Sequence, residues 1–446
     1  MPNTLVPGQS RLGHVLHDDE GGPFPASLSL EDRKLRLTVP WFGDEEQRHE
    51  RRFIGDAAWW GDDPDGTRFR YSIPNELLFV DPAGTVVLTG CRSVGWTTSF
   101  GVGAGTGQIA VDFAILGAND TSHFTRINGL QTQVEGLGMW LRSSSIDEQV
   151  ESNPDGTLRA LMLRLESPPP IAGSPILNLE FHPSFMRAHE RADQILVHDG
   201  VSVQTMTGKV RSWGEHLDCH FAVRDLMRIA AWRAVNFVDA KATRNASPER
   251  LMSGEIVGRA WRPVVSPLLG AMGSSTELRR SDLLFSHADA APGGVHRWVK
   301  MHREAPRAIQ PVLRLLDLEG ASLETHVAQL GMGLEALAYH LARGAGVGAQ
   351  DAGNESFRSR IERICALLPS GLSVLEPNDS LPADLAQGYN AVKHANRPLP
   401  DADFLLNVYR RGIQLFRAWV LTLIGVQRNT LRSRINGDRI TRLLNQ

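Results

Sequence analysis

Cysteine is scarce in this sequence, and the few cysteines stand far apart. The chain of 446 residues has three, at Cys91, Cys219 and Cys365. An odd number of widely spaced cysteines argues against a disulfide framework and favours a reducing compartment. Long hydrophobic runs are also lacking, since the longest, over residues 418–426, is far shorter than the roughly 20 residues of a membrane-spanning helix. Because the N-terminus has no signal-peptide pattern either, we expect a cytoplasmic protein with no membrane partner.

Common catalytic signatures are missing as well. The sequence has no GxSxG elbow and no Cys–His signature, so covalent hydrolase chemistry has no support. No pair of carboxylates can be placed as in a glycosidase, which argues against a carbohydrate-active β-sandwich. The glycine-rich GVGAGTG of residues 101–107 lacks the Gly-Lys-Ser/Thr ending of a phosphate-binding loop, and a strand pattern follows it where a helix is required. We predict a flexible β-loop there.

Soft metal ligands gather at only one place in the sequence. His216, Cys219 and His220 would share one helical face. A structural zinc site normally needs a fourth ligand, and no second Cys/His pair supplies one. The sequence therefore predicts no metal site.

Strand and turn signals dominate the first half of the chain. Asp81-Pro82-Ala83-Gly84 and Asn153-Pro154-Asp155-Gly156 place proline and glycine where β-turns use them. Alternation of apolar with smaller or polar residues is typical of half-buried strands. The strand-like segments are 34–39, 84–90, 108–116, 158–166 and 175–182. Together they predict an antiparallel β-sandwich or barrel-like domain over residues 1–210.

Helical periodicity dominates the second half. A first helix is predicted over 216–235, and residues 241–292 have no clear pattern, so 211–294 is interpreted as a mixed, partly helical connecting region. Further helices are predicted over 307–318, 322–342, 357–368, 383–396 and from about 402 onward. Short connections between such helices indicate a bundle over residues 295–446. The fold class predicted is therefore α+β and multidomain, an antiparallel β domain followed by an all-α bundle.

The C-terminal end is basic although the whole chain has a net charge of −3. From residue 401 onward three aspartates stand against the arginines 410, 411, 417, 428, 432, 434, 439 and 442. Such a tail suits a polyanionic partner, although a solvated helix face would look the same.

One predicted helix carries a polar motif, YNAVKHANRP of residues 389–398. At about 100° per residue, Tyr389 falls in the apolar sector of the helix. A contiguous polar sector holds Asn390, Lys393, His394 and Arg397. A third sector holds the small residues Gly388, Ala391 and Ala395, which would let another helix approach closely.

A histidine beside an amide and two cations suits cleavage of RNA without a metal ion. His394 could take a proton from a 2′-hydroxyl or give one to the leaving 5′-oxygen. Lys393 and Arg397 would stabilise charge on the phosphate, and Asn390 would orient the imidazole or the phosphate. An ordinary polar helix face has the same composition, so the pattern alone leaves both interpretations open.

Asn390-x3-His394, preceded by LGMGLEALAYHLA and FRSRIERICALL, resembles the HEPN domain in its ApeA-like branch. The β-rich part with LTVPWF and VEGLGMWLRSS is similar to the N-terminal domain that accompanies that branch. The resemblance implies a metal-independent endoribonuclease of bacterial abortive infection, an anti-phage defence in which a toxin cleaves cellular RNA, tRNA among the candidate substrates. It also implies a homodimer through the HEPN domain, a phage-derived trigger recognised by the N-terminal domain, and no cofactor.

The resemblance assigns roles residue by residue. His394 matches the catalytic histidine and Asn390 matches the polar position, while Lys393 and Arg397 would contact the phosphate. Tyr389 stands where the family motif, R-x4–6-H, has its arginine, and tyrosine carries no permanent cation.

Three explanations of this departure stay open. Lys393 or Arg397 could supply the charge, or an arginine from the helix predicted over 357–368 could do so. The candidates on that helix are Arg358, Arg360 and Arg363. Alternatively, the chain is a non-catalytic HEPN-like module for RNA binding, protein binding or dimerisation.

Overall fold

The chain divides into two compact units, each built from several stretches of sequence. The computed structural model describes residues 3–16, 23–42, 53–54, 61, 64–65, 73–99, 101–118, 124–188, 196–270, 278–373, 375 and 380–444. Unit 1 comprises Met1–Gln133, Gln204–Leu217 and Asn236–Ser274, and unit 2 comprises Val134–Val203, Asp218–Val235 and Ser275–Gln446. The domain boundaries expected near residues 210 and 294 describe parts that fold independently, which the two compact units do not test, so these boundaries stay a prediction.

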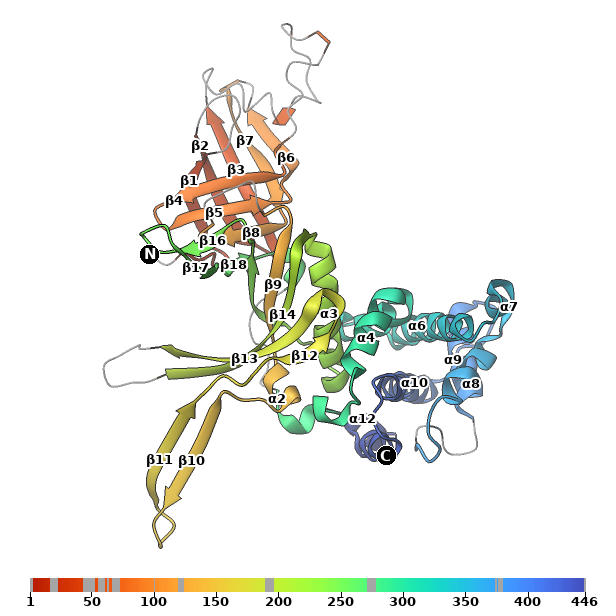
Figure 1. The fold of residues 1–446 in the computed structure, drawn as a ribbon. Coiled ribbons are helices and arrows are strands. Elements are labelled where there is room, and N and C mark those ends of the chain that lie inside the picture. The colour runs from red at the N-terminus through yellow and green to blue at the C-terminus, as the bar shows by residue number, and fades with distance from the viewer. Residues whose placement is uncertain are drawn as a thin grey trace. The chain divides into compact units, whose positions relative to one another are not determined.

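Unit 1 is built on an antiparallel sheet (Figure 1). Its hydrogen-bonded order is β14-β9-β15-β18-β8-β5-β4-β1-β2-β3-β7-β6, and β16 and β17 form a separate hairpin. The strands are β1 Ser10–Val15, β2 Phe24–Glu31, β3 Lys34–Phe42, β4 Glu76–Asp81, β5 Gly84–Thr89, β6 Arg92–Ser99, β7 Ala104–Val111, β8 Phe113–Leu116, β9 Ile127–Val134, β14 Leu196–Arg211, β15 Phe237–Thr243, β16 Pro248–Arg250, β17 Ile256–Arg259 and β18 Arg262–Val265. Strand β14 begins in unit 2 and ends in unit 1.

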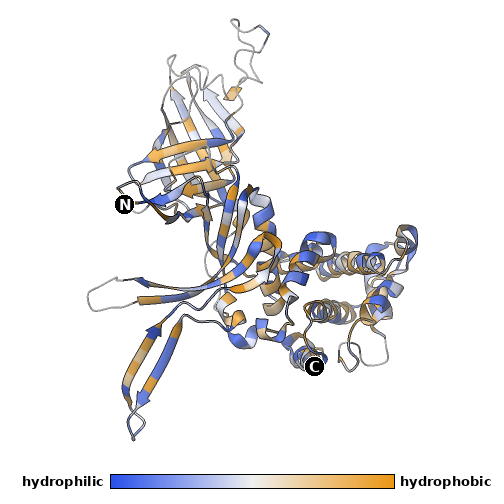
Figure 2. Cartoon of the chain, viewed as in Figure 1, coloured by the Kyte–Doolittle hydropathy of each residue, from blue (hydrophilic) through white to orange (hydrophobic). Residues whose placement is uncertain are grey.

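Alternation of side chains explains why these segments are strands. In β3, Leu35, Leu37, Val39 and Trp41 are buried while the residues between them are partly or fully exposed. Since successive side chains of a strand point to opposite faces, one face of β3 enters the core. Figure 2 shows β4 and β5, which complete this core, largely in the orange of hydrophobic residues.

The loops and turns of unit 1 follow from its polar and glycine residues. Of GVGAGTG, residues 101–103 form the turn before β7 and residues 104–107 already belong to that strand, so the loop predicted over 101–107 is shorter than expected. At the β4–β5 turn, the Asp81 carboxylate accepts the backbone N–H groups of Ala83 and Gly84 at 2.9 and 3.1 Å. The strand predicted over 108–116 is two strands instead. Asp112 interrupts it, because its N–H donates to the Thr89 carbonyl and its carboxylate pairs with Arg92 at 2.6 Å.

The strands of unit 2 are fewer. Strand β12, Ile171–Ser174, pairs with β13, Leu179–Ala188, which lies beside β14. The strand predicted from residue 175 starts later than expected, since Ile176–Asn178 form a 3-10 turn in which Leu177 has a φ of 53°. Strands β10, Ile146–Ser152, and β11, Leu158–Leu165, form a separate hairpin (Figure 1).

The helices gather in the second half of the chain. The structure gives α2 Leu137–Leu141, α3 Trp213–Ala231, α4 Gly294–Glu304, α5 Pro306–Arg314, α6 Leu323–Gly344, α7 Ala349–Asn354, α8 Phe357–Cys365, α9 Leu381–Lys393, α10 Ala402–Leu423, α11 Arg428–Gly437 and α12 Arg439–Arg442. Several begin at a side-chain cap, as α6 does at Ser322, α8 at Ser356 and α10 at Asp401. Such caps satisfy the free N–H groups of the first turn.

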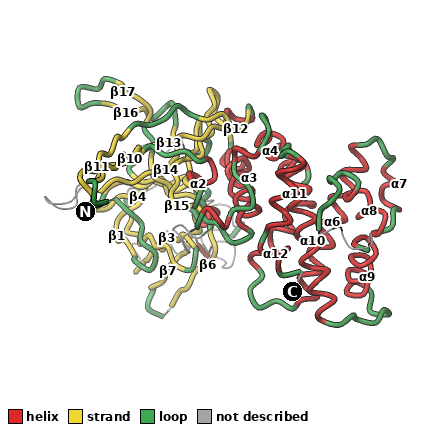
Figure 3. The backbone as a smooth tube through the Cα atoms, turned by 90° about the horizontal axis from the view of Figure 1, so that it is seen from below, coloured by secondary structure: helices red, strands yellow, loops and turns green. Residues whose placement is uncertain are grey.

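Helix α6 lies at the centre of the helical bundle. It contacts α5, α8, α9 and α10, and Figure 3 shows α6, α8 and α9 side by side with α7 near their end. Glycines allow close approaches, since a Cβ on Gly331 would meet the Tyr389 ring of α9 at 2.1 Å. A Cβ on Gly333 would meet Val312 of α5 at 2.5 Å. The first glycine lets α9 pack closely on α6, and the second does the same for α5.

The predicted fold class is confirmed: an antiparallel sheet forms the N-terminal part and a helical region the C-terminal part. Within the ranges that the structure describes, none of the helices combines the length and the hydrophobicity that crossing a membrane would require.

Candidate functional site

Helix α9 carries the polar motif up to its last turn. The helix begins with Leu381 and Pro382, where a proline in the first turn costs no hydrogen bond. It ends at Lys393, three residues before the predicted end at Asn396. His394 has an extended backbone, with φ −119° and ψ 110°, although its N–H still bonds to the Asn390 carbonyl at 3.0 Å. His394 and Arg397 therefore lie beyond the helix, and of the expected polar sector only Asn390 and Lys393 are helical.

Tyr389, at the motif's arginine position, is a packing residue. It is 4% exposed, and its ring lies 4.5 Å from the ring of Phe357 on α8. Its hydroxyl donates to Glu335 Oε2 of α6 at 3.1 Å. Burial, and next the charge of Glu335, raise the pKa of the Tyr389 hydroxyl above its usual value. The side chain is thus a neutral hydrogen-bond donor, and it cannot replace an arginine as a cation.

Glu335 connects this tyrosine to two cations. Arg360 of α8 pairs with Glu335 Oε1, and Lys393 Nζ lies 3.7 Å from Oε2. The Lys393 ammonium also lies 5.2 Å from the centre of the Tyr389 ring. One carboxylate thus joins α6, α8 and the end of α9. Sequence reasoning missed Glu335, although a lone acidic residue inside the apolar LGMGLEALAYHLA segment was the available signal.

None of the three candidate arginines of α8 serves His394 in this chain. Arg360 is 6% exposed and also donates to the carbonyls of Ala352 and Gly353. The exposed Arg358 pairs with Glu362 at 3.0 Å, and Arg363 pairs with Glu355. Across the described ranges, no hydrogen bond or ion pair joins any of these arginines to Asn390 or His394.

The small-residue sector of α9 is used largely inside the chain. A Cβ on Gly388 would meet Val408 of α10 at 3.0 Å, and Ala391 is buried. Ala395 alone of the three is exposed. The close helix approach expected on this sector is therefore the packing of α9 against α10.

The exposed end of α9 is left with a free imidazole. His394 and Arg397 are exposed and Asn390 is half-buried. In the part of the chain that the structure describes, the side chains of these three residues have no hydrogen-bond or ion-pair partner. The Arg397 N–H bonds to the His394 carbonyl at 3.0 Å, so a turn brings the arginine back toward the histidine. A free imidazole with Lys393 before it and Arg397 after it can exchange protons with a bound polyanion.

An arginine and a histidine elsewhere in the chain have the spacing of the family motif but another environment. Arg297 and His302 on α4 are separated by four residues. Arg297 donates to the carbonyls of Leu423 and Ile424 at 2.8 and 3.0 Å, at the end of α10. His302 is 7% exposed, and its Nε2 lies 2.9 Å from Asp225 Oδ2 of α3. Spacing alone therefore does not identify the site.

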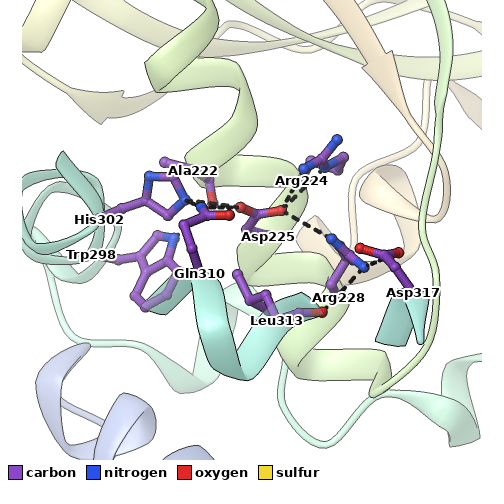
Figure 4. A network of polar contacts seen from close by, with 9 residues as sticks. All are labelled: Ala222, Arg224, Asp225, Arg228, Trp298, His302, Gln310, Leu313 and Asp317. Carbon is purple, nitrogen blue, oxygen red and sulfur yellow. Dashed lines mark hydrogen bonds and ion pairs between the residues drawn. The ribbon is translucent and has the colours of Figure 1, made fainter. Parts of the chain in front are cut away.

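Asp225 is the centre of this buried network (Figure 4). Besides His302, it accepts Arg224 Nη2 at 2.8 Å and lies 3.8 Å from Arg228, whose other amine donates to Asp317 at 2.6 Å. Burial alone would raise the pKa of Asp225, but the hydrogen bond from His302 and the charge of Arg224 outweigh it and hold the pKa below its usual value. The network holds α3, α4 and α5 together.

The residues with metal-ligand chemistry do not form a site. His216 Nδ1 bonds to the Thr205 hydroxyl at 2.7 Å, and burial lowers the pKa of this histidine to about 4. Burial raises the pKa of the Cys219 thiol to about 11, so it is not a ready thiolate ligand. A search of the described residues finds no group of three or more His, Cys, Asp or Glu side chains that could hold a metal ion.

Comparison with known families decides the classification of the chain. The model of ApeA N-terminal domain 1 matches residues 11–259, which is more than half of the sequence. The chain belongs to the ApeA family. The match spans the strands from β1 to β17 and helix α3, leaves out β18, and ends before the helical bundle begins.

Membership in the ApeA family suggests a role in anti-phage abortive infection. No curated protein and no solved structure matches the chain. For this ApeA-family chain, the likeness of the helical region to HEPN rests on the sequence motif alone.

Proposed function

We propose that this chain is a metal-independent endoribonuclease of bacterial anti-phage defence, in which a HEPN-like helical domain over residues 295–446 cleaves cellular RNA. The observation that carries the proposal is the exposed His394 imidazole at the end of α9, which has no hydrogen-bond or ion-pair partner within the described ranges. It lies four residues after Asn390 and is flanked by Lys393 and Arg397. Membership in the ApeA family supports the biological setting.

Each residue has a distinct role in the proposed reaction. His394 accepts the proton of the attacking 2′-hydroxyl or donates one to the leaving 5′-oxygen. Arg397 and Lys393 stabilise the negative charge that develops on the phosphate, and Asn390 orients the phosphate or the imidazole. Because Tyr389 supplies no charge and Arg360 is engaged by Glu335, Arg397 is the cation with the fewest competing contacts.

A homodimer completes the proposed site. Two copies of the helical domain would place their His394 turns on one RNA strand, so that the second copy adds the charge that Tyr389 does not provide. The β-rich domain, residues 1–210, would recognise a phage-derived trigger, and residues 211–294 would connect it to the nuclease.

RNA cleavage in the presence of EDTA tests this proposal. The purified full chain is compared with His394→Ala and with Gln387→Ala, a substitution at an exposed position of the same helix. We expect cleavage by the wild type and the control and loss of cleavage in His394→Ala. Equal cleavage by all three proteins, or cleavage only with added metal, would show that the mechanism is wrong.

A second function is favoured by the contacts of Glu335. That carboxylate neutralises Arg360 and draws Lys393 toward the packed side of α9. A domain whose cations are engaged in this way suits a non-catalytic module that binds RNA or protein, or dimerises. RNA retention without cleavage, unchanged in His394→Ala, would favour this function over the first.

A further inference from the structure

A cleft lined by arginines lies within unit 2, formed by residues that the proposed cleavage does not use. It has a volume of about 690 Å³, in the range of small-molecule sites. Its walls are the residues that follow α3, the 3-10 turn of Arg280–Asp282, and helices α10, α11 and α12. A volume of this size fits one small molecule.

The charge in the cleft is unbalanced. Five arginines line it, Arg233, Arg417, Arg434, Arg439 and Arg442, against the two carboxylates of Asp282 and Asp438. Asp438 is engaged by Arg417 at 2.8 Å, and Asp282 accepts the backbone N–H of Arg279 at 2.8 Å.

Two of these arginines are uncommitted. Arg439 and Arg442 are exposed, and neither has a hydrogen-bond or ion-pair partner among the residues described. Arg434, by contrast, pairs with Asp289 at 3.2 Å. Free guanidinium groups in a concave site are suited to phosphate oxygens, which they bind in bidentate fashion.

A smaller adjoining cavity extends the positive surface. It has a volume of about 320 Å³ and shares Ser281, Leu283 and Arg434 with the first. It adds Arg142 and Arg280, and its lining has no acidic residue. The two cavities together could hold a base at one end and several phosphates at the other.

An aromatic residue on the wall indicates what lies beside the phosphates. Trp232 directly follows the last residue of α3, and its φ of 47° is in the left-handed region. Glycine is the residue that adopts this conformation without strain, so a tryptophan here is held against its backbone preference. The Arg417 guanidinium lies 5.7 Å from the indole, and the half-buried ring lines the cleft. An indole beside arginines can stack a nucleobase.

We propose that this cleft binds a nucleoside polyphosphate, with its base against Trp232 and its phosphates on Arg439 and Arg442. The ligand is a free nucleotide and not an RNA strand, because the cleft has the volume of a single small-molecule site. Nucleotide binding in this cleft does not require RNA cleavage at His394, so the cleft is a second site within unit 2.

Calorimetric titration of the full chain with ATP, GTP and pyrophosphate tests the proposal. The double variant Arg439→Ala/Arg442→Ala should bind every ligand about tenfold or more weakly, because charge-assisted hydrogen bonds to the phosphates are lost. Trp232→Gly, which relieves the backbone strain, should lower the affinity for the nucleotides by about tenfold and leave the affinity for pyrophosphate unchanged. Trp232→Phe should keep nucleotide binding. Arg428→Ala removes an exposed arginine of α11 that lines neither cavity, and should change nothing.

The results that would overturn nucleotide binding differ from those that would overturn RNA cleavage. Absence of saturable nucleotide binding, or equal binding by wild type and Arg439→Ala/Arg442→Ala, overturns the proposal. Equal affinity for pyrophosphate and nucleotides overturns the role of Trp232. Tight binding of an oligoribonucleotide that depends on these arginines, with no binding of ATP or GTP, overturns the choice of a free nucleotide. His394→Ala should bind the nucleotide like the wild type, whether or not the chain cleaves RNA.

Discussion

Two histidines of unit 2, His302 and His394, stand at the motif spacing from Arg297 and Tyr389 and lie in opposite environments. His302 is buried on α4 and held by Asp225, with Gln310 Nε2 at 3.3 Å from its ring nitrogen. His394 lies beyond the end of α9, exposed and without a side-chain partner in the described ranges. A histidine whose ring is fully engaged stabilises the fold, whereas a free one can exchange protons with a ligand. Mutation should therefore separate stability at one from activity at the other.

Removal of the exposed imidazole should have the largest effect. In His394→Ala we expect the RNA cleavage rate to fall by about 10²- to 10⁴-fold, the usual contribution of a general acid or base. The thermal unfolding temperature should not change, because the side chain is exposed and makes no hydrogen bond or ion pair in the described part of the chain. Single-turnover cleavage assays and calorimetry of the same preparation measure both. A lower unfolding temperature with intact cleavage would reverse the comparison.

Removal of the buried carboxylate should affect stability instead. Asp225→Ala leaves His302 and Arg224 without their acceptor, and breaking a buried ion pair costs about 3–5 kcal/mol. Glu362→Ala, which breaks the exposed pair with Arg358, should cost at most about 1 kcal/mol. Urea unfolding followed by tryptophan fluorescence compares the two variants. Equal losses would mean that the network of Figure 4 carries no special stability.

Lowering the pH should weaken the same network, because it protonates Asp225. The folded-state pKa of Asp225 lies below its value in the unfolded chain, near 3.9. The stabilisation is therefore present above about pH 4 and is lost as the pH falls through the lower, folded-state pKa. We expect Asp225→Asn to be less stable than the wild type at neutral pH, with the difference shrinking below about pH 4. A constant difference between the two unfolding curves from neutral to acidic pH would contradict the assignment.

The smallest effect is expected at the cations beside His394. In Arg397→Ala, RNA binding should weaken, and the slope of log affinity against log salt should decrease by about 0.7, the value for one phosphate contact on a single strand. Arg358→Ala, which removes an exposed cation of α8 paired with Glu362, should leave the slope unchanged. Filter binding at several salt concentrations measures both slopes. Identical slopes would exclude Arg397 as a phosphate contact.

Local sequence patterns were sufficient for most elements of the fold. Alternation identified β3, and helical periodicity identified α6, α8 and α10, because in each the buried residues repeat at the period of the backbone. The break at Asp112 was missed because the apolar alternation runs through it. The break lies where the chain changes its partner strands, from β3 and β6 to β5 and β18, and this tertiary pairing cannot be read from local alternation.

The candidate site was predictable only in part. The residues on α9 could be named, but the end of the helix at Lys393 could not, since the preference against helix before Pro398 does not say how far back it acts. The contacts of Glu335 were also beyond reach, because they join α6, α8 and α9 over long sequence separations. Of the arginine-lined cleft, the sequence showed only that the C-terminal end is basic, because the cleft is formed by segments far apart in the chain.

The close packing of Tyr389 on Gly331 makes these two positions dependent on each other. A side chain at Gly331 would overlap the Tyr389 ring, and a smaller residue at Tyr389 would leave a void above Gly331. Tyr389→Arg would bring a third cation to the Glu335 carboxylate, which Arg360 and Lys393 already share. The arginine typical of the motif is thus separated from this sequence by several coordinated substitutions, and a single exchange would damage the bundle before it could restore the motif.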